Sequence, residues 1–345
     1  MTPRASSPAV GSPLLEVEDL VVRFDTDGGV VHAVEGVSFV LRAGETLGLV
    51  GESGCGKSTV ARAIVGLVPV TSGSIRLNGE ELVGHPAALR AARPRLQMVF
   101  QDPYASLNPR MTVASIVGEP LVIHRRVAGA AALEAKVGEL LETVGLDPSL
   151  RRRYPHEFSG GQRQRIGLAR SLALEPDVIL LDEPVSALDV SVQAQVLNLL
   201  DDLRRRLGLT YLFIAHNLGV VRHVSDRIAV MYLGRIVELA GRDELFEHPV
   251  HPYTQALLSA VPVPDPVIEA NRRRIPLEGE IPSPTAEITG CAFRSRCPKA
   301  FDRCATEAPL LTERTPGRFA SCHLDDEPAL AKPAPRPSKL GGSSF

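Results

Sequence analysis

The sequence predicts an α/β protein with a parallel sheet covered by helices, followed by a small, loop-rich extension. Two observations predict this arrangement. Between residues 46 and 215, short apolar runs rich in β-branched residues alternate with helical stretches, which is typical of parallel sheets. After about residue 250, prolines crowd the chain and regular patterns become rare. A length of 345 residues agrees with about two domains.

The elements follow in chain order. Residues 1–13 and 329–345 are rich in Pro, Ser, Ala or Gly and are expected to be disordered tails. Strands are predicted at 17–24 and 34–41, with a hairpin turn at 25–29, and a buried strand at 46–50. Further strands (96–100, 178–181, 210–215, and a strand pair over 226–238) alternate with helices (57–65, 130–144, 159–174 and 192–207).

Composition excludes several classes of protein. Lys plus Arg number 38 and Asp plus Glu number 40, so the net charge is −2. This excludes a generally basic nucleic-acid binder and an acidic disordered chain, and we expect no nucleic-acid partner. There is no run of 18 apolar residues to span a membrane. The N-terminus lacks the apolar core of a secretory signal. Four of the five cysteines lie beyond residue 290.

Residues 51–59 read GESGCGKST and match G-x-x-x-x-G-K-[ST] between an apolar strand and a helix. Glycines let the backbone wrap around an anion, and the helix N-terminus adds positive potential. Lys57 is predicted to reach the β- and γ-phosphates, and Ser58 to bind Mg²⁺. The small Cys55 is interpreted as a filler. The predicted nucleotide-binding residues are Gly51, Ser53, Gly54, Cys55, Gly56, Lys57, Ser58 and Thr59.

A second apolar strand, over residues 178–181, ends in two carboxylates. Asp182 suits a Mg²⁺ contact, largely through water. Glu183 suits a general base that orients the attacking water. Either acid alone could be a solvated strand end, but the phosphate-binding loop in the same chain favours the functional interpretation.

Further motifs carry a resemblance to a known family. FSGGQRQR (158–165) resembles the signature motif of ATP-binding cassette (ABC) proteins, and Gln101 matches that family's Q-loop. His216 matches its switch histidine, and residues 186–189 its D-loop. The D-loop residues are Ser186, Ala187, Leu188 and Asp189. The resemblance covers residues 14–250. It implies a P-loop NTPase fold with a RecA-like parallel-sheet core, an antiparallel β subdomain and an α-helical signature subdomain.

The resemblance also implies the roles of these residues. Glu183, His216 and Gln101 would be catalytic, and Gln101 would join Ser58 and Asp182 around Mg²⁺. Ser159 is a good helix N-cap, and two glycines at a helix start make another anion cradle. Two cassettes would pack head to tail, each signature acting on the partner's ATP. The signature residues are Ser159, Gly160, Gly161 and Gln162.

The adenine platform departs from the family pattern. The family places an aromatic residue upstream of the phosphate-binding loop, where this chain has Gly28 and Gly29. Phe24 is the nearest aromatic residue and His32 a further candidate, although Phe24 could equally be a strand core residue.

Longer stretches resemble one branch of the family, the ATP-binding subunits of bacterial oligopeptide and dipeptide importers. They are residues 101–111, 153–158, 183–195 and 251–254, together with the proline-rich extension. The likeness is to the second of two paired subunits, which implies a heterodimer of ATPases. It also implies two transmembrane permease subunits, which the loop after Gln101 would meet, and an extracytoplasmic substrate-binding protein. Peripheral attachment to the cytoplasmic face of the inner membrane follows. The expected domains are 14–250 and 251–328.

The late cysteines suggest a metal site. Cys291, Cys297, Cys304 and Cys322 cluster in sequence, and reduced thiols in a cytosolic chain favour a metal over disulfides. Four thiolates suit zinc or an iron–sulfur cluster, and His323 is a possible stray ligand. Importer subunits with this pattern resemble [4Fe–4S] binders. A [4Fe–4S] cluster, zinc and no metal at all stay open, and a structural role is expected.

The predicted function is ATP hydrolysis that energises peptide import. Nickel, glutathione or an oligosaccharide are alternative cargoes, because the ATPase subunit does not touch the cargo. A non-transport cassette protein would carry two cassettes or a long coiled-coil insertion, and neither is present. A metal-binding module without ATPase activity is disfavoured by the intact Lys57, Asp182, Glu183 and His216.

Overall fold

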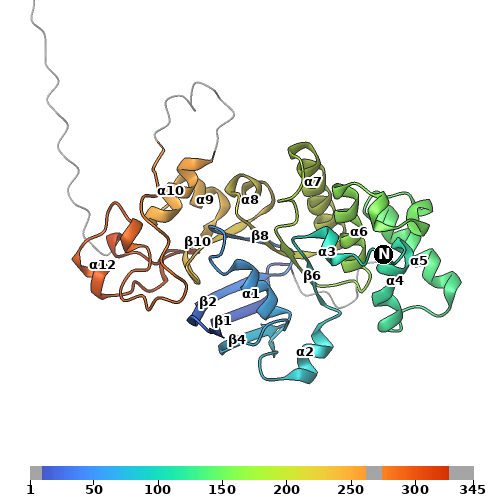
Figure 1. Ribbon diagram of the computed structural model, residues 1–345, viewed down its shortest axis with the longest axis horizontal. Helices are drawn as coiled ribbons and strands as arrows, with labels where there is room; N and C mark the ends of the chain where they lie inside the picture. The colour runs from blue at the N-terminus through green and yellow to red at the C-terminus, as the bar shows by residue number, and fades with distance from the viewer. Residues whose placement is uncertain (1–9, 262–273, 326–345) are drawn as a thin grey trace, which may run out of the picture.

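The computed structural model describes residues 10–261 and 274–325 (Figure 1). The predicted C-terminal tail lies outside these residues. The predicted N-terminal tail lies outside them only as far as residue 9, and its end needs correction. The Gly11 N–H donates to the Ala43 carbonyl at 2.9 Å, and the first strand already begins at Pro13. Backbone pairing therefore starts before the apolar pattern becomes visible in the sequence.

A four-stranded antiparallel sheet has the strand order β2-β1-β4-β5. Its strands are β1 (Pro13–Thr26), β2 (Gly29–Arg42), β4 (Ser72–Leu77) and β5 (Glu80–Glu81). The predicted hairpin is confirmed, because β1 pairs with β2 as far as Thr26 opposite Gly29. The expected antiparallel β subdomain is therefore present.

The central sheet has the order β11-β12-β10-β9-β3-β8-β7-β6. Strands β9, β3, β8, β7 and β6 run parallel, as predicted, and β10 closes a hairpin with β9. The bounds are β3 (Thr46–Val50), β6 (Leu96–Val99), β7 (Val178–Asp182), β8 (Thr210–Ala215), β9 (Arg227–Tyr232), β10 (Arg235–Gly241), β11 (Thr312–Thr315) and β12 (Arg318–Ala320).

Helices cover the sheets and form a separate group at one end (Figure 1). The α-helices are α1 (Lys57–Ile64), α2 (Pro86–Ala92), α3 (Pro103–Ser106), α4 (Val113–Ile123), α5 (Ala130–Thr143), α6 (Gly160–Leu172), α7 (Val190–Leu207), α8 (Leu218–Val224), α9 (Arg242–Glu247), α10 (Pro252–Ala260) and α12 (Asp302–Thr306). The four predicted helices are present as α1, α5, α6 and α7, whereas α4, α10 and the shorter helices were not predicted. The 3₁₀ turns are η1 (Pro148–Arg152), η2 (Pro155–Glu157), η3 (Arg294–Arg296) and η4 (His323–Asp325).

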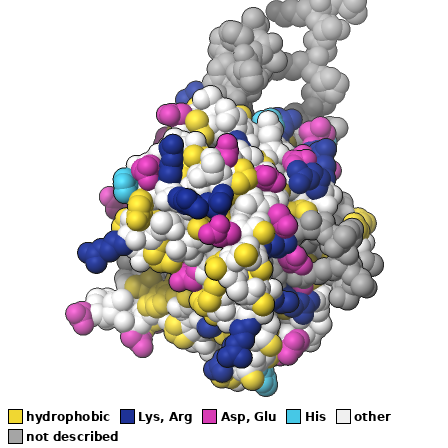
Figure 2. All heavy atoms as spheres, turned by 90° about the vertical axis from the view of Figure 1, so that its right-hand side faces the viewer, with side chains coloured by type: hydrophobic (Ala, Val, Ile, Leu, Met, Phe, Trp, Pro, Cys, Tyr) yellow, Lys and Arg dark blue, Asp and Glu magenta, His cyan; other side chains and the backbone are white. Residues whose placement is uncertain are grey.

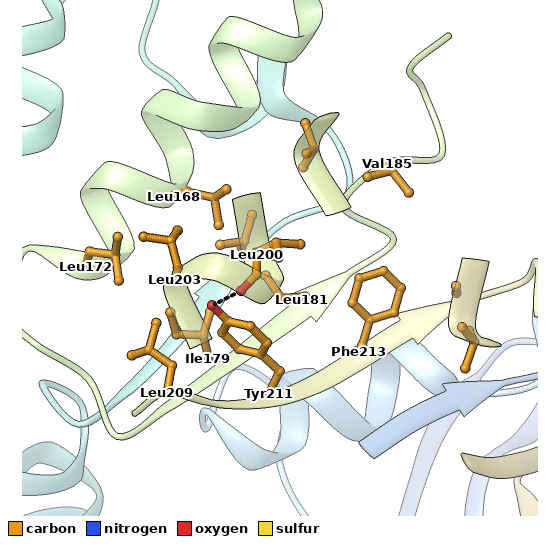
Figure 3. Close-up of a cluster of buried hydrophobic side chains, with 14 of the residues drawn as sticks. Leu168, Leu172, Ile179, Leu181, Val185, Leu200, Leu203, Leu209, Tyr211 and Phe213 are labelled. Atoms are coloured by element: carbon orange, nitrogen blue, oxygen red, sulfur yellow. Dashed lines mark hydrogen bonds between the residues drawn. The ribbon is translucent and has the colours of Figure 1, made fainter. Parts of the chain in front are cut away.

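Two hydrophobic cores lie on opposite faces of the central sheet. Along β7, Ile179 and Leu181 belong to the first core, and Val178 and Leu180 to the second. This alternation follows from the two-residue period of a strand. In the first core, leucines of α6 and α7 pack on β7 and β8, and the Tyr211 hydroxyl donates to the Leu200 carbonyl at 3.2 Å (Figure 3). Burial on both faces explains why these strands are apolar throughout.

The C-terminal segment, residues 274–325, lies against the cassette at the end opposite α4 and α5 (Figure 1). Its strand β12 pairs with the edge strand β10, with Glu238 opposite Ala320 and Leu239 opposite Phe319. The His32 N–H also donates to the Pro284 carbonyl at 2.9 Å. The segment thus extends the central sheet. Among the helices described, none is both long and apolar enough to cross a membrane.

Candidate functional site

The phosphate-binding loop connects β3 to α1, as predicted. Gly56 precedes α1 with φ of 103°, and a Cβ there would lie 2.1 Å from the Ala33 carbonyl oxygen. Only glycine combines this backbone conformation with such a close approach. Cys55 is buried, and burial raises the pKa of its thiol, in agreement with its interpretation as a filler.

Lys57 is held by the loop itself. Its Nζ donates to the Gly51 carbonyl at 2.9 Å and to the Glu52 carbonyl at 2.8 Å, and the residue is only 4% exposed. The ammonium group therefore lies within the loop that its motif assigns to phosphate. An incoming anion would compete with two neutral carbonyl oxygens for this cation, and charge-assisted hydrogen bonds are the stronger kind.

The structure brings together two of the three predicted Mg²⁺ residues. The Ser58 hydroxyl donates to Asp182 Oδ1 at 2.8 Å, across 124 residues of sequence. Burial raises the pKa of the Asp182 carboxyl, and the Ser58 hydrogen bond opposes that rise. A hydroxyl beside a carboxylate is the oxygen donor set that Mg²⁺ prefers. The third residue, Gln101, contacts Glu183.

The three predicted catalytic residues meet at one carboxylate oxygen. Gln101 Nε2 donates to Glu183 Oε2 at 3.1 Å, and His216 Nδ1 lies 3.1 Å from the same oxygen. Glu183 follows β7, Gln101 follows β6 and His216 follows β8, so all three lie at the carboxyl edge of parallel strands. Glu183 has φ of 46°, which is uncommon for a residue with a side chain. Such strain is often found at functional sites.

The signature turn is capped as predicted. Ser159 Oγ accepts the Gln162 N–H at 3.4 Å, and Gln162 Oε1 accepts the Ser159 N–H at 3.0 Å. A Cβ on Gly161 would lie 2.4 Å from Val192 of α7, so the turn packs closely on the helix that follows the D-loop. Among the described residues, no hydrogen bond joins Ser159, Gly160, Gly161 or Gln162 to the phosphate-binding loop. The second anion cradle is therefore separate from the first.

The D-loop lies between Glu183 and the signature turn. The Ser186 hydroxyl donates to the Glu183 carbonyl at 3.1 Å. A Cβ on Gly160 would lie 3.1 Å from Leu188. The loop thus contacts both the catalytic carboxylate residue and the signature helix. Arg163 was not among the predicted site residues, and its guanidinium carbon lies 3.7 Å from the centre of the Tyr104 ring. This contact joins the signature helix to the loop after Gln101.

The adenine candidates have other contacts. Phe24 packs against the second core, the alternative that the sequence left open. His32 Nδ1 lies 2.8 Å from Glu35 Oε1. Neither contact assigns the adenine platform, so Phe24 stays a prediction.

The cysteines of the C-terminal segment do not form the predicted metal site as arranged. Burial raises the pKa of the Cys291 thiol, and the Cys291 N–H donates to the Cys304 carbonyl at 2.8 Å. Yet within residues 10–261 and 274–325, no group of three or more His, Cys, Asp or Glu side chains is arranged to hold a metal ion. His323 Nε2 lies 2.9 Å from the Glu307 carbonyl oxygen, so this nitrogen is engaged by the backbone. The donor set thus supports neither a cluster nor zinc.

Two further residues that were not predicted contact the phosphate-binding loop from outside. The Tyr253 hydroxyl accepts the Glu52 N–H at 3.0 Å. Arg296 donates to both carboxylate oxygens of Glu52, at 2.7 and 3.0 Å. The stretch around Tyr253 resembles the importer branch of the family, but no motif marks Arg296 itself.

Comparisons with known proteins agree with these motifs. Residues 34–186 match the family model described as "ABC transporter", and residues 237–304 match "Oligopeptide/dipeptide transporter, C-terminal region". The chain is 55% identical to the putative oligopeptide transport ATP-binding protein YkfD of Bacillus subtilis, covering 90% of this chain and 95% of that protein. It is 54% identical to the oligopeptide transport ATP-binding protein OppF of Escherichia coli, covering 86% and 92%.

A solved structure shares the cassette fold. It is the dimeric, post-hydrolysis state of the ATP-binding cassette MJ0796 bound to ADP and Pi, with a TM-score of 0.61 and 26% identity. The match covers 66% of this chain and 99% of that one.

Proposed function

The chain belongs to the family of oligopeptide transport ATP-binding proteins of the ABC class, and from this premise we propose that it hydrolyses ATP to energise peptide import. One observation carries the chemistry. The Ser58–Asp182 pair and the Gln101–Glu183–His216 group lie at the same edge of the central sheet. This edge, at the carboxyl ends of parallel strands, is where ligands bind in α/β folds.

The catalytic step depends on how Glu183 is held. Gln101 and His216 both meet Oε2, which leaves Oε1 to accept a proton from water as that water attacks the γ-phosphate. A general base held in place by two partners loses little orientation in the transition state. When bound by Ser58 and Asp182, Mg²⁺ would neutralise phosphate charge. Lys57 would leave the Gly51 and Glu52 carbonyls for the β- and γ-phosphates.

Hydrolysis on this proposal requires a second cassette. The signature residues Ser159 and Gly161 make no hydrogen bond to the phosphate-binding loop in the described part of the chain, so they are available for a partner's nucleotide. The cassette MJ0796 is dimeric with ADP and Pi bound. We propose that the partner here is a related but different ATPase subunit, since the chain resembles one of two paired subunits.

We further propose that permease subunits dock in a groove beside the Q-loop. The groove has a volume of about 420 Å³ and lies between the central sheet and α4. Figure 2, viewed toward the face that carries α4 and α5, shows hydrophobic side chains gathered in a hollow. Leu67 is 57% exposed and Ile123 68%. The apolar residues lining the groove include Leu67, Met98, Phe100, Pro120, Ile123 and Leu174.

This docking would place the protein at the cytoplasmic face of the membrane as a peripheral subunit. Because Phe100 lines the groove and precedes Gln101, a permease seated there would act directly on the loop that holds Glu183. Ile123→Glu is expected to abolish co-purification with the permease subunits. The matched variant Val190→Glu, on the 82% exposed start of α7, should leave co-purification intact. Equal recovery of both variants would exclude the groove as the docking site.

The cargo is proposed from the relatives, whose printed names specify oligopeptide transport. The test is reconstitution of the chain with its permease, partner ATPase and binding protein in vesicles. ATP-dependent uptake of a labelled peptide is expected. Uptake of nickel, glutathione or an oligosaccharide without peptide uptake would identify an alternative cargo. Hydrolysis without any transport would favour a non-transport ATPase.

We retain a [4Fe–4S] centre at Cys291, Cys297, Cys304 and Cys322 as a proposal, with zinc as the alternative. Its support is the family likeness and the backbone hydrogen bond between Cys291 and Cys304, and the side chains would have to rearrange around the centre. Anaerobic purification followed by absorbance, iron and sulfide assays tests it. Iron and sulfide in equal amounts are expected. A colourless protein that contains zinc favours the alternative, and one without either metal removes the site.

A further inference from the structure

Every polar group of Glu52, a residue inside the phosphate-binding loop, is engaged by a specific partner. Its carbonyl accepts from Lys57 Nζ, and its N–H donates to the Tyr253 hydroxyl at 3.0 Å. Its carboxylate receives two hydrogen bonds from the Arg296 guanidinium. Two of these three partners lie far outside the loop, and Arg296 is 244 residues away in sequence. The loop is therefore held from outside as well as by its own motif.

Arg296 is a rigid partner. Its side chain is 5% exposed, whereas that of Glu52 is 24% exposed. The guanidinium carbon lies 5.9 Å from the centre of the Tyr232 ring, and the residue ends the short turn η3. Planar, two-point pairing with a carboxylate fixes direction as well as distance. A buried arginine that pairs with the carboxylate at two points thus sets where Glu52 can lie.

The elements that carry Tyr253 and Arg296 are locked to each other by aromatic packing. Phe293, one turn before Arg296, is 1% exposed. Its ring centre lies 5.2 Å from that of Tyr232 and 5.4 Å from that of Tyr253. Tyr232 and Tyr253 are 4.8 Å apart. This aromatic cluster (Tyr232, Tyr253 and Phe293) joins β9, α10 and the C-terminal segment, so both contacts to Glu52 share one support.

We propose that Arg296 and Tyr253 form a clasp that positions the phosphate-binding loop for nucleotide, and that Arg296 is a positioning residue for ATP binding. The proposal rests on the proposed ATPase function. A loop that is already ordered spends less of its binding free energy on ordering when phosphate arrives. The coupling is reciprocal, so bound nucleotide must also stabilise the attachment of the C-terminal segment.

The test uses the assembled transporter with the variants Arg296→Gln, Glu52→Gln and the double variant. A fluorescent ATP analogue gives the Kd, and steady-state hydrolysis gives KM and kcat. Arg296→Gln is expected to raise Kd and KM about tenfold, within the usual range of coupling between sites. kcat at saturating ATP should stay within about twofold of wild type, because uniform binding affects KM alone.

Two further variants separate positioning from simple packing. The double variant should recover part of the affinity, because it removes the unpaired carboxylate that the single variant leaves half-buried. Arg296→Lys should recover less, because an ammonium group cannot make the planar two-point contact. The matched control is Arg303→Gln, in the same segment, because Arg303 pairs with Glu307 rather than with Glu52. It should bind ATP like wild type.

Hydrogen exchange without nucleotide provides a readout that does not depend on ATPase activity. Amides of residues 51–56 should exchange faster in Arg296→Gln and at the wild-type rate in Arg303→Gln. Unchanged exchange and unchanged Kd in Arg296→Gln, with only a lower Tm, would overturn the clasp and leave Arg296 as a packing residue. Faster exchange in Arg296→Gln, together with a wild-type transporter that does not hydrolyse ATP, would uphold the clasp and reject the proposed function.

Discussion

The nucleotide-binding edge and the C-terminal segment are held in place in different ways. At the edge, β3, β7 and β8 are buried along their whole length and paired strand to strand. The functional residues follow directly on these strands. The C-terminal segment has strands of three and four residues and relies on contacts with distant parts of the chain. The comparison teaches that a sequence motif can specify the first kind of site but not the second.

The largest effect is expected at the edge, from Glu183→Gln. The amide keeps the shape of the side chain but cannot accept a proton as a base, so kcat should fall about 10²- to 10⁴-fold. ATP binding should persist, because Lys57 and the loop are untouched. Single-turnover hydrolysis and nucleotide binding in the assembled transporter measure both quantities.

The matched control is Glu139→Gln, which removes an exposed carboxylate and its pair with Lys136. It should leave kcat unchanged. Unchanged turnover in Glu183→Gln would exclude this residue from the role of base.

Phe293→Ala should have the largest effect on the C-terminal segment. Removing this buried ring opens a cavity beside Tyr232 and Tyr253 and should cost about 3–5 kcal/mol of unfolding free energy. Denaturant unfolding measures the loss. Leu310→Ala, at a position 78% exposed, should stay within about 0.5 kcal/mol of wild type. Equal stability of the two variants would show that the aromatic cluster does not hold the segment.

The buried His251, just before α10, should make the stability of the protein depend on pH. Burial lowers the pKa of His251 to about 3, whereas an unfolded histidine titrates near 6.5. Below pH 6.5 the unfolded state therefore takes up a proton that the folded state rejects. Stability is fully present above the unfolded pKa and falls as pH is lowered. The loss should be about 2 kcal/mol between pH 7 and pH 5.

His251→Asn removes this loss while an amide can still cap α10, whose Tyr253 N–H now donates to His251 Nδ1 at 3.1 Å. Burial also raises the pKa of nearby Glu238, so this carboxyl lowers the free energy of unfolding as pH rises. It does so in both the wild type and His251→Asn. The measurement is therefore the difference between two slopes of unfolding free energy against pH. Parallel slopes would contradict a neutral, buried His251.

The smallest effect is expected from Tyr211→Phe in the first core. The variant keeps the ring and loses only the hydrogen bond to the Leu200 carbonyl, at a cost of about 1 kcal/mol. Tyr232→Phe is the matched comparison, because the buried Tyr232 hydroxyl lies near Arg296 but makes no well-formed hydrogen bond among the described residues. It should be neutral or slightly stabilising in thermal unfolding. A larger loss of stability in Tyr232→Phe than in Tyr211→Phe would contradict the hydrogen bond between Tyr211 and Leu200.

Most of the cassette could be predicted because its signals are local. Strand β3 and strand β8 have the predicted bounds, and Ser159 is the N-cap of α6, as predicted. Short elements such as α2 and β5 were missed, since a few residues carry too little periodicity. The metal prediction had only a count of cysteines behind it, and side-chain geometry decides ligation.

The sequence by itself determined the fold class, the phosphate-binding loop, the signature turn and the carboxylates at the sheet edge. These features depend on backbone conformation and hydrogen bonding within a few residues, so the local sequence specifies most of their geometry. Only the tertiary structure decided that Gln101 and His216 share one oxygen of Glu183, and that Arg296 reaches Glu52. Such contacts join residues far apart in the chain, and their distances depend on how the sheets, helices and aromatic cluster pack together.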